Sequence, residues 1–325
     1  MGSDKGGIPH TPVTGATPDG VPLALNRAPA ADLEPWIARV MVAIAHAPAD
    51  TVSTGFLCND ASYVRTAMGG HWTVETADGT REFLNESLVC GQHSRGWKLV
   101  YRGPVIVAGF ALKPGAYRAI WGVDDGALVD RIAPTTHLGF EDSELTGLYE
   151  RGMDAQVWLL RIEEWLRDTI ARRRAPYPQP LAQRLDEAAF ADPNQSPADI
   201  AERHGATLRT LQRTARRAFG LSPKQVLRRA RVLDLAARMC GVADKREEED
   251  FLLRYFDQSH LIRDFSAFFG RSPQQFMDNR QRLLTLSLEI RQARRLELLN
   301  RIAPDAVRPW MMQTSLPPAD LPAQR

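Results

Sequence analysis

Cysteine is scarce in this sequence, with three in 325 residues, and none of Cys58, Cys90 and Cys240 belongs to a C-x-x-C pair. Single, widely separated cysteines argue against a disulfide framework and against the common zinc patterns. The chain also lacks any apolar run of 18 residues, and residues 1–30 lack the basic stretch and apolar core of a secretion signal. These absences predict a cytoplasmic protein that is neither exported nor membrane-spanning.

Signatures of common enzymes are missing too: the sequence contains no G-x-S-x-G, no G-x-x-x-x-G-K-[ST] and no H-E-x-x-H. His71, His93 and His137 are 22 and 44 residues apart, which matches no common metal-ligand spacing. Cys58 and Cys90 have no adjacent basic cluster that would lower the pKa of a thiol, so we interpret them as buried structural residues. We therefore predict a protein that is not an enzyme, without catalytic residues, metal or cofactor.

Charge is unevenly distributed behind a net value of +2. Residues 181–302 hold 22 Lys or Arg and 16 Asp or Glu, a net charge of +6, which leaves −4 for the rest of the chain. The length and the 44% hydrophobic content allow two domains with real cores. We expect only the C-terminal half to bind a polyanion.

A short phrase occurs twice, as Phe-Gly-Leu-Ser-Pro at 219–223 and Phe-Gly-Arg-Ser-Pro at 269–273, 50 residues apart. A phrase repeated at such a spacing indicates a repeated supersecondary unit. Before the first copy, Ser196 suits an N-cap, Pro197 suits the first helical position, and Gly205 suits a helix end. A second helix is expected from about residue 208, so the segment reads as a helix-turn-helix.

The second helix of this unit is strongly amphipathic. At 100° per residue, one face gathers Leu208, Leu211, Ala215, Ala218 and Phe219, and the opposite face gathers Arg209, Thr210, Arg213 and Arg217. From Arg203 to Arg231 there are nine basic residues and no acidic one. A solvated helix face would explain the arginines, but it would not explain the turn or the repeat.

These motifs resemble the C-terminal domain of the AraC/XylS family of transcription regulators. The resemblance covers residues 183–282 and rests on Ile200-Ala201 with Gly205, Leu211-Gln212-Arg213, Gly220 to Pro223, Tyr255-Phe256-Asp257-Gln258-Ser259-His260 and Phe269 to Pro273. It implies two helix-turn-helix units joined by a central helix at about 223–240, with a second recognition helix at about 259–269. The sequence departs from the family at Lys245 to Asp250, where an apolar support helix is usual, and at Ala215, where a large aromatic is usual.

Ten candidate DNA-binding residues follow from this resemblance and from the basic face. Arg209, Thr210 and Arg213 are expected near base edges, and Arg216, Arg217 and Arg228 near phosphates. The remaining candidates are Gln212 in the first unit and Gln258, His260 and Arg263 in the second. The implied partners are double-stranded DNA, RNA polymerase for an activator, a second copy of the chain, and a small-molecule effector, with no membrane.

The N-terminal half has short apolar runs of strand length, separated by turn residues such as Ala77-Asp78-Gly79-Thr80. The runs are 40–45, 54–58, 63–67, 72–76, 87–90, 97–101 and 105–112. They predict a β-rich, barrel-like domain after a disordered leader at 1–30. Aromatic candidates to line an effector pocket are Trp72, Trp97, Tyr101 and Trp121.

A periodic helix is expected at about 154–172, with an apolar stripe of Val157, Leu160, Ile162, Trp165, Leu166 and Ile170. The strands, the Pro-Gly-Ala phrase at 114–116 and this helix are similar to the sensor domain of a subgroup of the same regulators. Beyond the second repeat, apolar residues from Leu283 to Ile302 predict a further helix. That helix either packs on its own chain or forms a dimer contact.

The sequence thus predicts an α+β protein in five parts: a leader at 1–30, a β-rich sensor or dimerisation domain at 31–172, a proline-rich linker at 173–182, a DNA-binding domain at 183–282, and a helical extension with a tail at 283–325. The predicted function is sequence-specific DNA binding that regulates transcription. Two alternatives stay open. One is a DNA-localised enzyme or repair-type protein with a catalytic N-terminal module, and the other is an interaction protein with a degenerate second helix-turn-helix.

Overall fold

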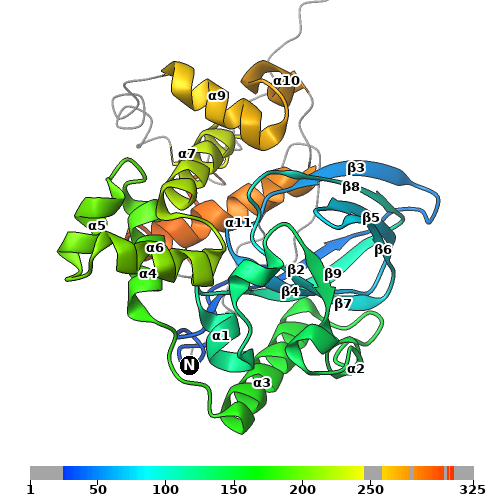
Figure 1. Cartoon of the computed structure of the whole chain (residues 1–325). Helices are drawn as coiled ribbons and strands as arrows, with labels where there is room; N and C mark the ends of the chain where they lie inside the picture. The colour runs from blue at the N-terminus through cyan, green and yellow to red at the C-terminus, as the bar shows by residue number, and fades with distance from the viewer. Residues whose placement is uncertain (1–24, 245–257, 279–281, 304–305, 307, 311–325) are drawn as a thin grey trace, which may run out of the picture.

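Two antiparallel sheets and two groups of helices make up the part of the chain that the structure describes (Figure 1). The structure is a computed structural model that describes residues 25–244, 258–278, 282–303, 306 and 308–310. The first sheet has the order β1-β2-β9-β4-β7-β10 and the second the order β3-β8-β5-β6. The strands are β1 Leu25–Arg27, β2 Ile37–Ala45, β3 Val52–Leu57, β4 Ser62–Ala67, β5 His71–Thr76, β6 Gly79–Phe83, β7 Glu86–Cys90, β8 Trp97–Arg102, β9 Val105–Leu112 and β10 Ile132–Pro134.

All seven expected strands are present, and the turn at 77–80 joins β5 to β6, with Thr76 opposite Gly79. The barrel expectation is corrected, because the described strands divide between two separate sheets and do not close into one barrel. The expectation of a disordered leader at 1–30 is wrong at its C-terminal end. There Leu25–Arg27 forms strand β1 and pairs with β2, and both Leu25 and Asn26 are buried. Residues 1–24 lie outside the described part.

Side chains alternate between two cores along the central strands, as the period of a β-strand requires. Val40 and Val42 of β2 pack with the helices on one face of the six-stranded sheet, whereas Met41 packs on the other face with residues of the four-stranded sheet. The four-stranded sheet contributes Trp72, Val74, Trp97 and Leu99 to that second core. The space between the sheets is therefore apolar.

Short helices and one long helix cover the outer face of the six-stranded sheet. They are α1 Ala116–Trp121, η1 Asp125–Leu128, η2 Thr135–Leu138, α2 Ser143–Thr146 and α3 Ala155–Arg173. Asp154 caps α3 by accepting from the backbone N–H groups of Gln156 and Val157. The apolar stripe expected on this helix is wrong at two positions. Val157 and Leu160 are 42% and 51% exposed and face away from the sheet.

The C-terminal half is helical, and its helices are α4 Pro180–Ala191, α5 Pro197–Arg203, α6 Leu208–Phe219, α7 Pro223–Met239, α9 Gln258–Phe269, α10 Pro273–Asp278 and α11 Arg282–Leu298. The proline-rich segment before α4 is held against the β-rich half, because Trp36 Nε1 donates to the carbonyl of Pro176 at 2.8 Å. Residues 245–250, where the sequence departs from the AraC/XylS pattern, lie outside the described residues.

The repeated Phe-Gly-x-Ser-Pro phrase ends one helix and begins the next in both copies. Gly220 and Gly270 have φ angles of +64° and +66°, in the left-handed region that glycine favours. Ser222 then accepts from the backbone N–H of Gln225, whose side chain accepts from the N–H of Ser222. Ser272 and Gln275 repeat this capping box at the start of α10. The repeat is therefore a device for turning the chain between helices.

Helix α11 crosses the centre of the molecule, between α7 and the two sheets (Figure 1). It packs on β3, α7 and α4. Two acidic residues of α11 meet basic and amide groups from elsewhere: buried Glu289 accepts from Asn26 at 3.3 Å, and Glu297, whose side chain is 11% exposed, pairs with Arg39. Burial raises the pKa of Glu289 to about 7. The predicted terminal helix thus packs on its own chain.

Candidate nucleic-acid interface and effector cavity

The basic face of α6 is exposed, whereas its other face is packed. Leu211, Thr214, Ala215, Ala218 and Phe219 are buried, and α6 packs on α4, α5, α7 and η1. The side chains of Arg209, Gln212, Arg213, Arg216 and Arg217 are exposed, and among the described residues none of them forms a hydrogen bond or ion pair. Leu208 was expected in the apolar face and is instead 41% exposed in the first turn.

The turn before α6 has the expected chemistry. Ser196 caps α5 by accepting from the backbone N–H of Asp199 at 3.1 Å, and Gly205 has a φ of +65°. Thr207 caps α6 by accepting from the N–H of Thr210, and the two hydroxyl oxygens are 3.0 Å apart. The hydroxyl of Thr210, a candidate for base contact, is therefore within hydrogen-bond distance of the hydroxyl that caps the helix.

The end of α6 is seated on the β-rich half. Gln92 Nε2 donates to the carbonyl of Ala218 at 3.1 Å. Gly220 lies against η1 so closely that a Cβ there would be 2.1 Å from Cγ2 of Val129. These contacts fix the position of the recognition helix relative to the sheets while leaving its basic face open.

The second candidate reader, α9, has a more acidic setting. His260 and Arg263 are exposed, and the side chain of Gln258 lies outside the described part. Asp264 lies 3.8 Å from Arg228 on α7. Arg228, which was expected to bind a phosphate, thus already has an acidic neighbour. Arg263 has the same acidic neighbour, because Asp264 follows it in the sequence.

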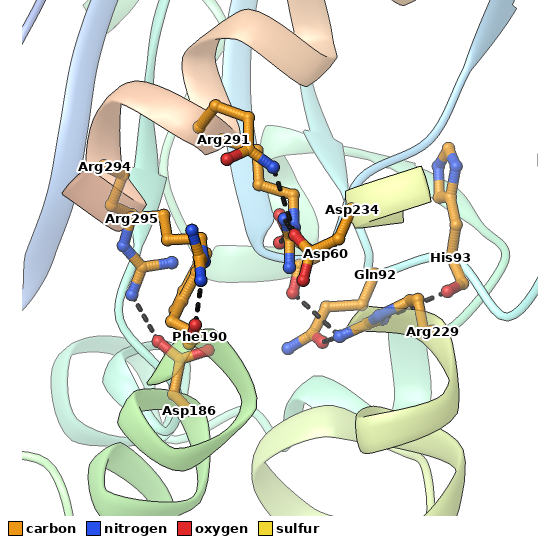
Figure 2. A network of polar contacts seen from close by, with 11 residues as sticks. Asp60, Gln92, His93, Asp186, Phe190, Arg229, Asp234, Arg291, Arg294 and Arg295 are labelled. Carbon is orange, nitrogen blue, oxygen red and sulfur yellow. Dashed lines mark hydrogen bonds and ion pairs between the residues drawn. The ribbon is translucent and has the colours of Figure 1, made fainter. Parts of the chain in front are cut away.

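A buried polar network joins the helices to the sheet loops (Figure 2). Arg229 on α7 donates to the carbonyl of His93 at 3.0 Å, the carbonyl of Asp60 at 2.9 Å and Oε1 of Gln92 at 2.8 Å. Arg291 on α11 donates to Asp60 Oδ2 at 2.8 Å and to Asp234 on α7. Burial lowers the pKa of Arg229, but an arginine stays charged in proteins, so both guanidinium groups act as permanent cations in this network.

An apolar cavity of about 100 Å³ lies between the sheets. Among the four aromatic residues predicted to line an effector pocket, Trp72 alone lines this cavity. Tyr101 stacks on Trp72 at 5.0 Å between ring centroids, and Trp97 lies in the same core but stacks on His93 at 3.9 Å. Trp121 belongs to the other core, beneath α3, so the structure separates it from this cavity.

Further lining residues, which the sequence pattern does not single out, come from several elements, notably Met41, Leu88, Leu283, Leu286 and Ile290. Periodicity predicts that such residues are buried, but it does not tell which pairs of surfaces leave a space between them. Arg65 is the charged residue among the lining residues, and its Nη2 donates to Asn59 Oδ1 at 2.9 Å.

The environments of the cysteines and of His93 do not favour a reactive thiolate or a charged imidazole. Cys58, Cys90 and Cys240 are buried, and burial raises the pKa of the Cys58 and Cys90 thiols, which disfavours a reactive thiolate. His93 is buried, and desolvation holds its pKa well below the usual value. Among the described residues no group of three or more His, Cys, Asp or Glu side chains is placed to hold a metal ion.

The match to a family model agrees with the motifs. Residues 200–279 match a family model described as "Helix-turn-helix domain", of the AraC type, and a search of curated proteins finds no match. Solved structures with a similar fold include ToxT from Vibrio cholerae strain SCE256 with an unsaturated fatty acid bound, at 10% identity and a TM-score of 0.44, covering 73% of this chain and 94% of that one.

ToxT from Vibrio cholerae O395 matches at 8% identity and a TM-score of 0.42, covering 74% of this chain and 97% of that one. The AraC-like transcriptional activator CuxR matches at 13% identity and a TM-score of 0.28, covering 64% and 84%. Within the described part of this chain, no helix has the length and apolar character to cross a membrane. The chain carries an AraC-type helix-turn-helix domain in its C-terminal half.

Proposed function

We propose that this protein is a cytoplasmic, sequence-specific DNA-binding regulator of transcription. The observation that carries the proposal is the exposed basic face of α6, whose arginines are not engaged within the described chain while its opposite face is buried. Cations displayed on one helix face after a tight turn are suited to a major groove and its flanking phosphates.

The two ends of the basic face have different roles in this proposal. Arg209, Gln212 and Arg213 reach base edges, because arginine binds guanine and glutamine binds adenine through two hydrogen bonds. Arg216 and Arg217, near the seated end of α6, bind phosphates. His260 and Arg263 of α9 enter the next groove with a smaller contribution, because acidic Asp264 is adjacent to Arg263.

In this proposal the sheets and the cavity between them form the sensing part. If the protein activates transcription, RNA polymerase is its partner. A homodimer contact is assigned to the outward face of α3, where Val157 and Leu160 are exposed, since the apolar residues of α11 are buried in their own chain. Sedimentation of Leu160→Glu against the wild type tests this contact, and an unchanged dimer would exclude it.

The base-reading role is tested with a duplex selected from a random library and a scrambled duplex of the same composition. Arg213→Ala should cost about 1–3 kcal/mol on the selected duplex and little on the scrambled one. Arg263→Ala should cost less, and Arg151→Ala, at an exposed arginine in the turn before α3, should leave both affinities unchanged. A larger loss of sequence preference from Arg263→Ala than from Arg213→Ala would show that α9 is the main reader.

A further inference from the structure

The cavity between the sheets is completed by a helix that follows the DNA-binding domain in the sequence. Leu283, Leu286 and Ile290 of α11 are buried in the core between the sheets, and all three line the cavity. They recur at intervals of three and four residues, so they lie on one face of α11. A molecule in the cavity would therefore touch α11 as well as the strands.

The other faces of α11 are bound to the DNA-binding helices. Leu284 and Leu288 are buried in a separate core with residues of α7 and α9. Gln292 Nε2 donates to Asp234 Oδ1 on α7 at 3.0 Å. Arg294 pairs with Asp186 on α4 (Figure 2). A displacement of α11 thus disturbs its contacts with α4, α7 and α9.

The loops at the rim of the sheets are tied to the same helices. Asp60 accepts from Arg291 of α11 through its side chain and from Arg229 of α7 through its carbonyl. Packed interfaces of this kind change between discrete arrangements rather than deforming continuously. A shift of α11 at the cavity would therefore alter its contacts with α7, the helix expected to join the two helix-turn-helix units.

We propose that the cavity binds a small, uncharged, largely apolar molecule and that α11 transmits its presence to the DNA-binding helices. This inference rests on the proposed function for its readout and specifies the effector class and the route of regulation. The lining favours a neutral ligand, because it is nearly all apolar and the Arg65 guanidinium already donates to Asn59 and stacks on Tyr63 at 4.3 Å. A cavity of about 150 Å³ holds benzene, so a site of about 100 Å³ would take a single small ring after enlarging by about half.

The test uses the full chain, fluorobenzene as the probe, and two matched truncations on opposite faces of one helix. Leu286→Ala enlarges the cavity, whereas Leu288→Ala removes a similar buried side chain that faces α7. Fluorobenzene binding is followed by ¹⁹F NMR, and duplex DNA affinity by fluorescence anisotropy with and without saturating probe. Ile290→Val is the milder cavity variant if Leu286→Ala does not fold.

Fluorobenzene should bind the wild type, and more tightly the Leu286→Ala variant, with Leu288→Ala binding like the wild type. Saturating probe should change the wild-type DNA dissociation constant by about fivefold or more, the usual size of an allosteric coupling, and Leu288→Ala should reduce that change. Bound probe with an unchanged DNA affinity would overturn the role of α11. No binding to the wild type or to either cavity variant would overturn the ligand site, and tighter binding of benzoate would overturn the neutral class.

Failure of the proposed function is distinguishable from failure of this inference. If no duplex binds without probe, the regulator assignment fails. The coupling is then decided by hydrogen exchange, which should show altered protection of α11 and α7 amides when fluorobenzene is bound. Changes confined to the strands would contradict transmission through α11.

Discussion

Replacing Arg229 by methionine should destabilise the chain far more than the same change at Arg228, its neighbour on α7. The Arg229 guanidinium is buried and donates three hydrogen bonds to acceptors of the β-rich half. Each buried acceptor left without a donor costs about 1–3 kcal/mol, and breaking a buried charged network usually costs about 3–5 kcal/mol in total. Because Asp60 is close to the surface and water can reach it, we expect about 3 kcal/mol for Arg229→Met.

Arg228 provides the control, because its side chain is 49% exposed and its partner Asp264 is 3.8 Å away. Such a pair contributes about 0–1 kcal/mol. Urea unfolding at equilibrium, followed by tryptophan fluorescence and circular dichroism, measures both variants. The Arg229 variant should also separate the two signals into distinct transitions, because the two halves lose a connection. Equal costs for the two variants would refute the role assigned to the network.

Two other predictions concern the contact between η1 and α6. Burial raises the pKa of Asp125 to about 8, so the folded state holds this proton more tightly than the unfolded state does. The free energy of unfolding should therefore fall by up to several kcal/mol as pH rises from about 4 to 8. In urea titrations Asp125→Asn should remove most of this pH dependence, and an unchanged pH dependence would contradict the assignment. Gly205→Ala should destabilise the chain by about 1 kcal/mol, because of its positive φ alone. Gly220→Ala should cost about 1–3 kcal/mol more, because the added Cβ meets Val129. Equal costs in thermal unfolding would show that Gly220 is not tightly packed on Val129.

Local chemistry made the helical half predictable. Ser196, Gly205 and the Phe-Gly-x-Ser-Pro phrases determine where helices begin and end, and each of these signals depends on residues a few positions apart. Gln225 and Gln275, which complete the capping boxes, occupy the same position in each copy of the repeat. Seven strands followed from their apolar runs and turn residues for the same reason.

Long-range packing could not be predicted in this way. The sequence showed that Leu283, Leu286 and Ile290 are apolar at helical spacing, but only the fold shows that they meet Met41 and Trp72 across more than 200 residues. The same limit applied to Val157 and Leu160, whose exposure depends on how α3 is rotated on the sheet. The cavity arises where these surfaces fail to meet, so it has no local signature.

The salt dependence of duplex binding tests the central claim, that the basic face of α6 binds DNA, most directly. The full chain is titrated with the selected duplex at several salt concentrations, as the wild type and as the Arg216→Ala/Arg217→Ala double variant. Each lost phosphate contact reduces the slope of log K against log salt by about 0.9, so the double variant should show a slope lower by about 2, with a weakened affinity for every duplex. A double variant that keeps the wild-type slope would contradict the assignment of α6 as the DNA-binding surface.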